Sequence, residues 1–179
     1  MKLNIFNKKK KGFTLIEILL AVGFLSIASI SIFVVFNAAS TSSRARDEMW
    51  QMEELSNKIK ANYGVVSNYS GITNTVVINN NYAPSKMIDG TSLKNGFGGS
   101  ITVVANTTTG GTANNSFKIT SSNIPGNVCI KLASLASQYF NIVRIDNNVV
   151  KDINDLQIDP VTLSTRCNAD TVSIDYISL

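Results

Sequence analysis

The chain has 179 residues, which gives room for one globular domain with a hydrophobic core and one further segment. Its formal charge is +4, but five of its 16 basic side chains lie in residues 1–12, which contain no acid. Residues 13–179 therefore carry 11 basic and 12 acidic side chains, and this balance argues against a specific nucleic-acid-binding surface. The sequence has no histidine, the commonest general base and metal ligand, so we expect no enzyme, no metal site and no cofactor.

A basic run and a long apolar stretch stand at the N-terminal end. Lys8–Lys11 precede Gly12, and the sequence from Phe13 to about Phe36 is then predominantly apolar. About 24 helical residues at ~1.5 Å each give ~36 Å, enough to cross a hydrocarbon core of ~30 Å. Because basic residues stay on the cytoplasmic side, we expect the N-terminus inside and everything after Phe36 outside.

One carboxylate, Glu17, lies near the start of this apolar stretch. A charge toward the bilayer centre costs on the order of 2–3 kcal/mol, so such a residue usually has a function. The alternative is that Glu17 reaches the headgroups from about one helical turn inside the membrane edge. An ordinary secretory signal peptide is a weaker interpretation, because its apolar core is shorter and ends at a small-residue cleavage site.

Residues 11–17, with the sequence KGFTLIE, resemble the class III signal of type IV pilins and pseudopilins. The resemblance implies that prepilin peptidase cuts between Gly12 and Phe13 and methylates the new amine of Phe13. It also implies that Glu17 neutralises the N-terminal amine of a neighbouring subunit during assembly. Residues 1–12 would be a cleaved basic leader, and residues 13–36 the transmembrane and assembly half of a long helix.

The apolar periodicity predicts that this helix continues over residues 37–63 as an amphipathic half that packs on a head domain, residues 64–179. The stripe residues follow one another at spacings of three or four: Ala45, Met49, Met52, Leu55 and Ile59. Gly64 is a plausible end of the helix. We also expect Trp50 and the methionines to be core residues.

The head domain is predicted to contain a surface loop, a hairpin, a second helix and two further strands. The loop covers about residues 65–100, with one strand candidate at Thr75–Ile78, and its Gly-Phe-Gly-Gly segment, residues 96–99, resembles a segment before the sheet in larger type IVb pilins. The other expected elements are the hairpin strands Ile101–Ala105 and Ser116–Ser121, a short helix after Pro125, and strands at Asn141–Asp146 and Thr171–Ser178.

The two cysteines, Cys129 and Cys167, predict a disulfide in an exported chain. The fold class expected by resemblance is α+β, the pilin fold. In it a long N-terminal helix packs on a mostly antiparallel sheet, with a short helix in the disulfide-bounded C-terminal region. The helical cysteine and the 167 residues from Phe13 onward favour the type IVb, PilS-like subgroup, although Phe13 and the short leader depart from it.

The resemblance implies a structural subunit of a type IV pilus, a homopolymer used for adhesion, conjugation or related surface functions. Its partners would be its own copies, prepilin peptidase, the inner-membrane assembly machinery and the bacterial inner membrane before export to the extracellular fimbrium. A minor pilin, a type II secretion pseudopilin and a membrane-anchored enzyme or receptor domain remain as alternatives. A pseudopilin often has a calcium-binding loop near its C-terminus. Five aspartates of this sequence could supply oxygen ligands, but their spacing does not match that of a calcium-binding loop: Asp146, Asp152, Asp155, Asp159 and Asp170.

Overall fold

The structure is a computed structural model that describes residues 12–64 and 68–179, without the side chains of residues 28–38. Its residues form two compact units, 1–39 and 40–179, and each is considered separately. The predicted leader therefore lies outside the described residues, apart from Gly12.

The first helix, α1, runs from Leu15 to Tyr63 over 49 residues and confirms the predicted long helix. It ends where Gly64 donates its backbone N–H to the Lys60 carbonyl at 2.8 Å. A Cβ atom at position 64 would lie 2.5 Å from that carbonyl oxygen, so glycine is required at this close approach. The sequence signal for the helix end is thus explained by backbone packing.

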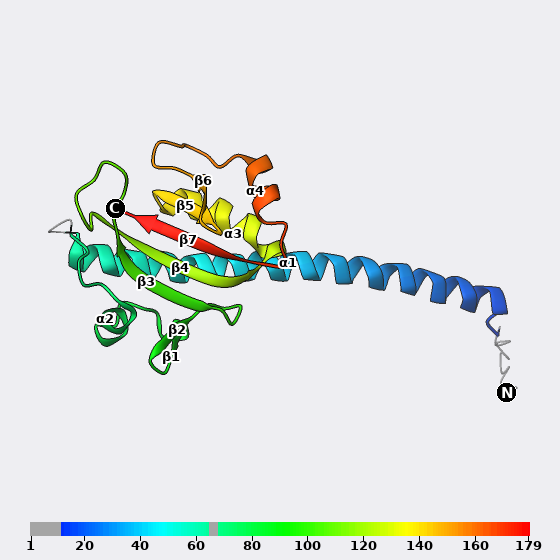
Figure 1. Cartoon of the computed structure of the whole chain (residues 1–179). Coiled ribbons are helices and arrows are strands. Elements are labelled where there is room, and N and C mark those ends of the chain that lie inside the picture. The colour runs from blue at the N-terminus through cyan, green and yellow to red at the C-terminus, as the bar shows by residue number, and fades with distance from the viewer. Residues whose placement is uncertain (1–11, 65–67) are drawn as a thin grey trace, which may run out of the picture. The chain divides into compact units, whose positions relative to one another are not determined.

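The unit of residues 40–179 is built on one seven-stranded antiparallel sheet in the order β1-β2-β3-β4-β7-β5-β6 (Figure 1). Its strands are β1 Ile88–Asp89, β2 Ser92–Lys94, β3 Ser100–Asn106, β4 Ser116–Pro125, β5 Ile142–Ile145, β6 Asn148–Lys151 and β7 Thr171–Ser178. The remaining helices are α2 Asn74–Asn79, a 3-10 turn Ser85–Met87, α3 Gly126–Tyr139 and α4 Pro160–Arg166. This arrangement confirms the predicted α+β fold, the hairpin and the second helix.

The core lies between the sheet and the amphipathic part of α1. Every residue of the predicted stripe, from Ala45 to Ile59, is buried. From the strands, Phe117, Ile119 and Tyr176 are fully buried in the same cluster. Trp50 is 62% exposed, so its prediction as a core residue is wrong. It follows Met49 by one residue, about 100° around the helix, and therefore lies off the stripe.

The strand predicted at Thr75–Ile78 is wrong, because these residues form helix α2. The Thr73 hydroxyl caps the helix by accepting the Val76 N–H at 3.3 Å. The Asn74 amide then fixes α2 to β3, donating to the Ile101 carbonyl and accepting from the Val103 N–H, both at 2.7 Å. A local cap and contacts with a distant strand thus override the β-branched composition.

The segment Asn95–Gly99, predicted as part of a surface loop, is a turn fixed by one buried amide. Asn95 Nδ2 donates to the Ser122 carbonyl at 2.6 Å, and Asn95 Oδ1 accepts from the N–H groups of Phe97 at 3.0 Å and Gly99 at 2.7 Å. A side chain at position 99 would overlap the Ser122 carbonyl. The glycine there is therefore explained by close packing of the turn on β4.

Helix α1 holds the same turn through Glu48, a buried carboxylate on the apolar stripe. Glu48 Oε2 accepts the Gly96 N–H at 2.8 Å. Burial raises the pKa of Glu48, and the bond from Gly96 opposes this shift. Among the described residues, neither Glu48 Oε1 nor the buried Tyr176 hydroxyl has a hydrogen-bond partner. Burial and then the Glu48 charge raise the pKa of Tyr176, so the two groups are electrostatically coupled.

The predicted disulfide between Cys129 and Cys167 is present in the structure. Cys129 lies within α3 and Cys167 follows α4, with their Cα atoms 5.6 Å apart. The bridge spans 38 residues, which include β5, β6 and α4, and both cysteines are buried. It therefore joins the second helix to the segment that leads into β7.

The first prediction concerns Glu48→Gln and the pH dependence of folding. Because the pKa of Glu48 is higher in the folded than in the unfolded state, protonated Glu48 contributes to the free energy of unfolding. This contribution is complete below the pKa of the unfolded state, about 4.3, and is lost as the pH rises through the pKa of the folded state. Glutamine keeps an oxygen for the Gly96 N–H but carries no charge. As the pH rises through the pKa of the folded state, the free energy of unfolding measured by urea titration of the detergent-solubilised subunit should therefore fall less in the variant than in the wild type. Glu53→Gln on the same helix should show the same dependence of the free energy of unfolding on pH as the wild type. If Glu48→Gln also showed the wild-type dependence, the prediction would be contradicted.

The second prediction is that replacing both Cys129 and Cys167 with alanine lowers the free energy of unfolding by about 4 kcal/mol, because the bridge restricts a long loop in the unfolded chain. Urea titration of the solubilised subunit measures this loss. Wild-type protein treated with a reductant should show a similar loss and serves as the control. Free thiols found at both positions by non-reducing peptide mapping of the native protein would refute the bridge.

Candidate functional site

The predicted functional residues at the N-terminal end form a reciprocal helix cap. Glu17 Oε2 accepts from both the Thr14 N–H and the Thr14 hydroxyl, each at 3.0 Å. In return, the Glu17 N–H donates to the Thr14 hydroxyl oxygen at 3.4 Å. Since α1 begins at Leu15, Thr14 occupies the N-cap and Glu17 the third helical position, which is the capping-box arrangement. This role was not predicted from the sequence, although threonine followed three residues later by glutamate is its signal.

The two sides of the predicted cleavage site are open in the structure. Phe13 is 83% exposed, and no atom of the neighbouring described residues lies within 4 Å of where a Cβ would stand on Gly12. The described apolar side chains that follow are exposed as well: Leu15, Ile16, Ile18, Leu19, Leu20, Val22, Phe24, Leu25 and Ile27. Within its own unit, this first part of α1 therefore offers a continuous apolar surface.

Among the residues that the structure describes, no helix is long and apolar enough to cross a membrane. The side chains of residues 28–36, the second half of the predicted membrane segment, lie outside the described ones.

Most of the aspartates considered for a calcium loop accept hydrogen bonds from backbone N–H groups within the protein. Asp159 caps α4 by accepting from the Val161 and Thr162 N–H groups. Asp146 Oδ1 accepts the Ser173 N–H at 2.8 Å, and Asp155 Oδ2 accepts the Asp152 N–H at 2.8 Å. Within residues 12–64 and 68–179, no group of three or more cysteine or acidic side chains is arranged to hold a metal ion.

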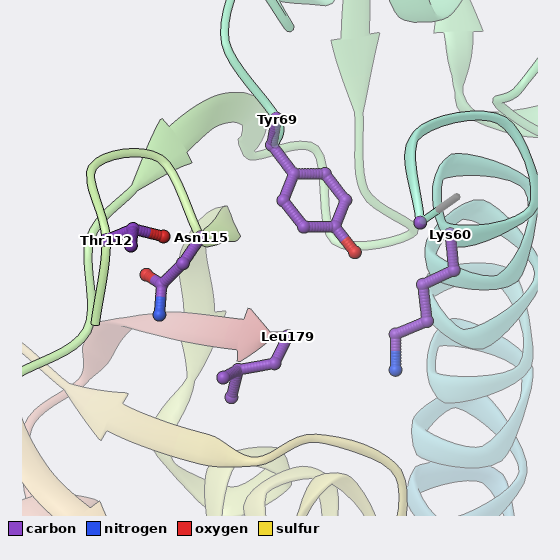
Figure 2. A pocket seen from close by; sticks show the side chains of 6 residues that line it. Lys60, Tyr69, Thr112, Asn115 and Leu179 are labelled. Atoms are coloured by element: carbon purple, nitrogen blue, oxygen red, sulfur yellow. The ribbon is translucent and has the colours of Figure 1, made fainter. Parts of the chain in front are cut away.

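One cavity of about 460 Å³ lies where the C-terminal end of α1 meets the β3–β4 turn (Figure 2). Figure 2 shows the Lys60 ammonium and the Tyr69 hydroxyl extending toward its centre, with Thr112, Asn115 and Leu179 around it. Burial lowers the pKa of Lys60 and raises that of Tyr69. Among the described residues that line it, no side chain carries a carboxylate or a thiol, and none is a predicted site residue.

The structure thus places the predicted site residues in both compact units. Gly12, Phe13 and Glu17 belong to residues 1–39, and the two cysteines belong to residues 40–179. Glu48 was not predicted from the sequence as a buried charged residue. Its position, three residues after Ala45 and four before Met52, puts it on the stripe and was the available signal.

The chain matches the family model described as PilS N terminal over residues 39–178. Two relatives, each named as the major structural subunit of bundle-forming pilus, come from Escherichia coli O111:H- and O127:H6. Each is 25% identical over an alignment 189 residues long, and the match covers 94% of this chain and 94% of the relative.

Two solved structures share the fold. The crystal structure of the type IV b pilin from Salmonella typhi has a TM-score of 0.56 and 20% identity, and the match covers 73% of this chain and 96% of that one. The crystal structure of TcpA, a type IV pilin from Vibrio cholerae El Tor biotype, has a TM-score of 0.58 and 12% identity, with 76% and 99% coverage. With the family match across most of the sequence, the chain belongs to the PilS family of type IVb pilins.

Proposed function

We propose that this chain is the major structural subunit of a type IV pilus and that it polymerises through its N-terminal helix. The observation that carries the proposal is the capped and exposed apolar start of α1 in a member of the PilS family. Exposed apolar surface of this extent needs either lipid or other protein to cover it. The relatives named as major structural subunits favour a filament protein over an enzyme.

The proposed maturation begins with the subunit in the bacterial inner membrane, with its basic leader in the cytoplasm. Prepilin peptidase removes residues 1–12 and methylates Phe13, and the inner-membrane assembly machinery then inserts the subunit into the extracellular filament. The exposure of Gly12 and Phe13 supports this step, because a peptidase needs an accessible bond. The filament serves adhesion, conjugation or a related surface function.

Glu17 has two compatible roles in this proposal. Its Oε2 atom accepts both capping bonds from Thr14, whereas Oε1 makes no hydrogen bond with any described residue. Glu17 Oε1 can therefore accept a hydrogen bond from the protonated Phe13 amine of a neighbouring subunit. An amine packed in a filament core without a counter-charge would cost several kcal/mol, so the pair would favour one axial register of the helices.

The third prediction is that sheared surface filaments consist mainly of this chain without residues 1–12 and with one methyl group on Phe13. Intact-mass analysis with N-terminal peptide sequencing measures both. A mature chain that begins elsewhere would contradict the maturation step. A filament in which this chain is only a trace component would contradict the role of major subunit and favour a minor pilin.

The fourth prediction separates the capping role of Glu17 from its charge. Glutamine at the third helical position preserves a capping box, whereas leucine removes both the cap and the charge. If the charge sets the register, both Glu17→Gln and Glu17→Leu should be processed in the membrane but yield at least about tenfold fewer filaments, as expected for the loss of a buried pair. Processed subunit in membrane fractions is compared with subunit in sheared filaments.

The matched control is Glu53→Gln, which removes a carboxylate from the second half of the same helix. It should leave filament yield unchanged. Normal filaments with Gln but not Leu at position 17 would assign Glu17 to helix capping alone. Normal filament yield with both variants would show that Glu17 is not needed for assembly, and its carboxylate would then only reach the lipid headgroups.

A further inference from the structure

A second cavity, of about 350 Å³, lies over the β5 end of the sheet between two connecting segments. One segment is the β3–β4 turn, and the other follows β6 toward α4 (Figure 1). The β5 residues that line it, Ile142 and Arg144, alternate with the core residues Val143 and Ile145 and so lie on the opposite face of the sheet. The lining residues, here called the Arg144 cavity, are Asn106, Thr108, Thr109, Ile142, Arg144, Val149, Asp152, Ile153 and Asn154.

Arg144 is the cationic group of this cavity, whose described lining also includes one carboxylate, Asp152. Its Nε atom is buried without a hydrogen-bond partner, and its side chain forms no ion pair with any described residue. Asp175 lies directly across the β5–β7 ladder, but its carboxylate accepts from the Thr120 hydroxyl at 2.6 Å and lies 3.7 Å from Lys118 Nζ. A partly buried, unpaired guanidinium is costly, and its best partner is a carboxylate held by two parallel hydrogen bonds.

The rest of the lining combines polar groups with a small apolar area. The Thr109 and Asn154 side chains line the cavity and make no hydrogen bond with any described residue. Val149 and Ile153 are 47% and 46% exposed, and they add apolar surface beside these polar groups. The single carboxylate, Asp152, accepts the Ile153 N–H through Oδ1 at 2.8 Å, so it already has a local bond. The lining therefore fits a ligand that is anionic at one end, hydroxylated elsewhere and apolar on one face.

We propose that the Arg144 cavity binds an acidic sugar unit. The sugar carboxylate pairs with the Arg144 guanidinium, its hydroxyl groups bond to Thr109 and Asn154, and its apolar ring face lies against Val149 and Ile153. The volume falls within the range of about 300–1,000 Å³ that is usual for small-molecule sites. This site involves neither Glu17 nor the cysteines, so it stands apart from the proposed assembly role.

The fifth prediction tests this site by calorimetric titration of the detergent-solubilised full chain with glucuronate and N-acetylneuraminate. These two probes separate uronic from sialic acids as sources of the carboxylate. At least one should bind saturably, at least about tenfold more tightly than both glucose and acetate, since neither comparison compound offers the carboxylate together with the ring. Arg144→Gln should weaken this binding at least tenfold, and Thr109→Val should weaken it by a smaller factor.

The matched control is Lys60→Gln, which removes a half-buried cation from the other cavity (Figure 2) and should leave binding unchanged. A urea unfolding midpoint in Arg144→Gln that is no lower than in the wild type would confirm that the folded subunit is being compared. Equal losses in Arg144→Gln and Lys60→Gln would overturn the assignment, because net charge would then explain the binding. Acetate or glucose binding as tightly as the acidic sugars, or no binding by any compound, would overturn it as well.

Discussion

The burial of one stripe of α1 against the sheet is the interaction on which the head domain depends. Ala45, Met49, Met52, Leu55 and Ile59 are at most 2% exposed, and each apolar side chain of this size gains about 1.5–3 kcal/mol on full burial, less for alanine. In the part of the chain that the structure describes, no second helix of comparable length covers this face of the sheet. The long helix is therefore a structural part of the head domain over its second half.

The same stripe carries a polar position that fixes a distant turn. Glu48 bonds to the Gly96 N–H, and Asn95 bonds the same turn to β4. A carboxylate in a core is costly unless it is bonded, and here one of its two oxygens has a partner. The turn before β3 is thus fixed to both the helix and the sheet, which explains why a segment rich in glycine is well defined here.

The elements with strong periodicity or capping signals could be predicted, and those that depend on contacts far along the chain could not. The stripe of α1 and the alternation in β3, β4 and β7 were sufficient to place these elements. Strands β1, β2 and β6 have only two to four residues, too few for a period of two to stand out. Helix α2 depends on bonds from Asn74 to β3, whereas α4 carried a readable signal in Asp159 followed by Pro160.

For the candidate site, the N-terminal motif located the functional residues, but the pairing of Thr14 with Glu17 required the structure. The unpaired guanidinium of Arg144 had no signal in the sequence, because an arginine in a strand normally faces solvent or a carboxylate. Its lack of a partner depends on Asp175 bonding to Thr120 and Lys118 instead. Such competition between neighbours is a property of the assembled sheet.

The place of β7 in the sheet has a consequence for how the subunit folds. Strand β7 lies between β4 and β5, so among the described strands the backbone pairing that joins β1–β4 to the pair β5–β6 runs through residues 171–178. Until this strand arrives, β4 and β5 each present an unpaired edge, which is a hazard for aggregation. Pairings this distant in sequence also form slowly. The head domain therefore remains incomplete until β7, the last strand along the described chain, has paired with both β4 and β5.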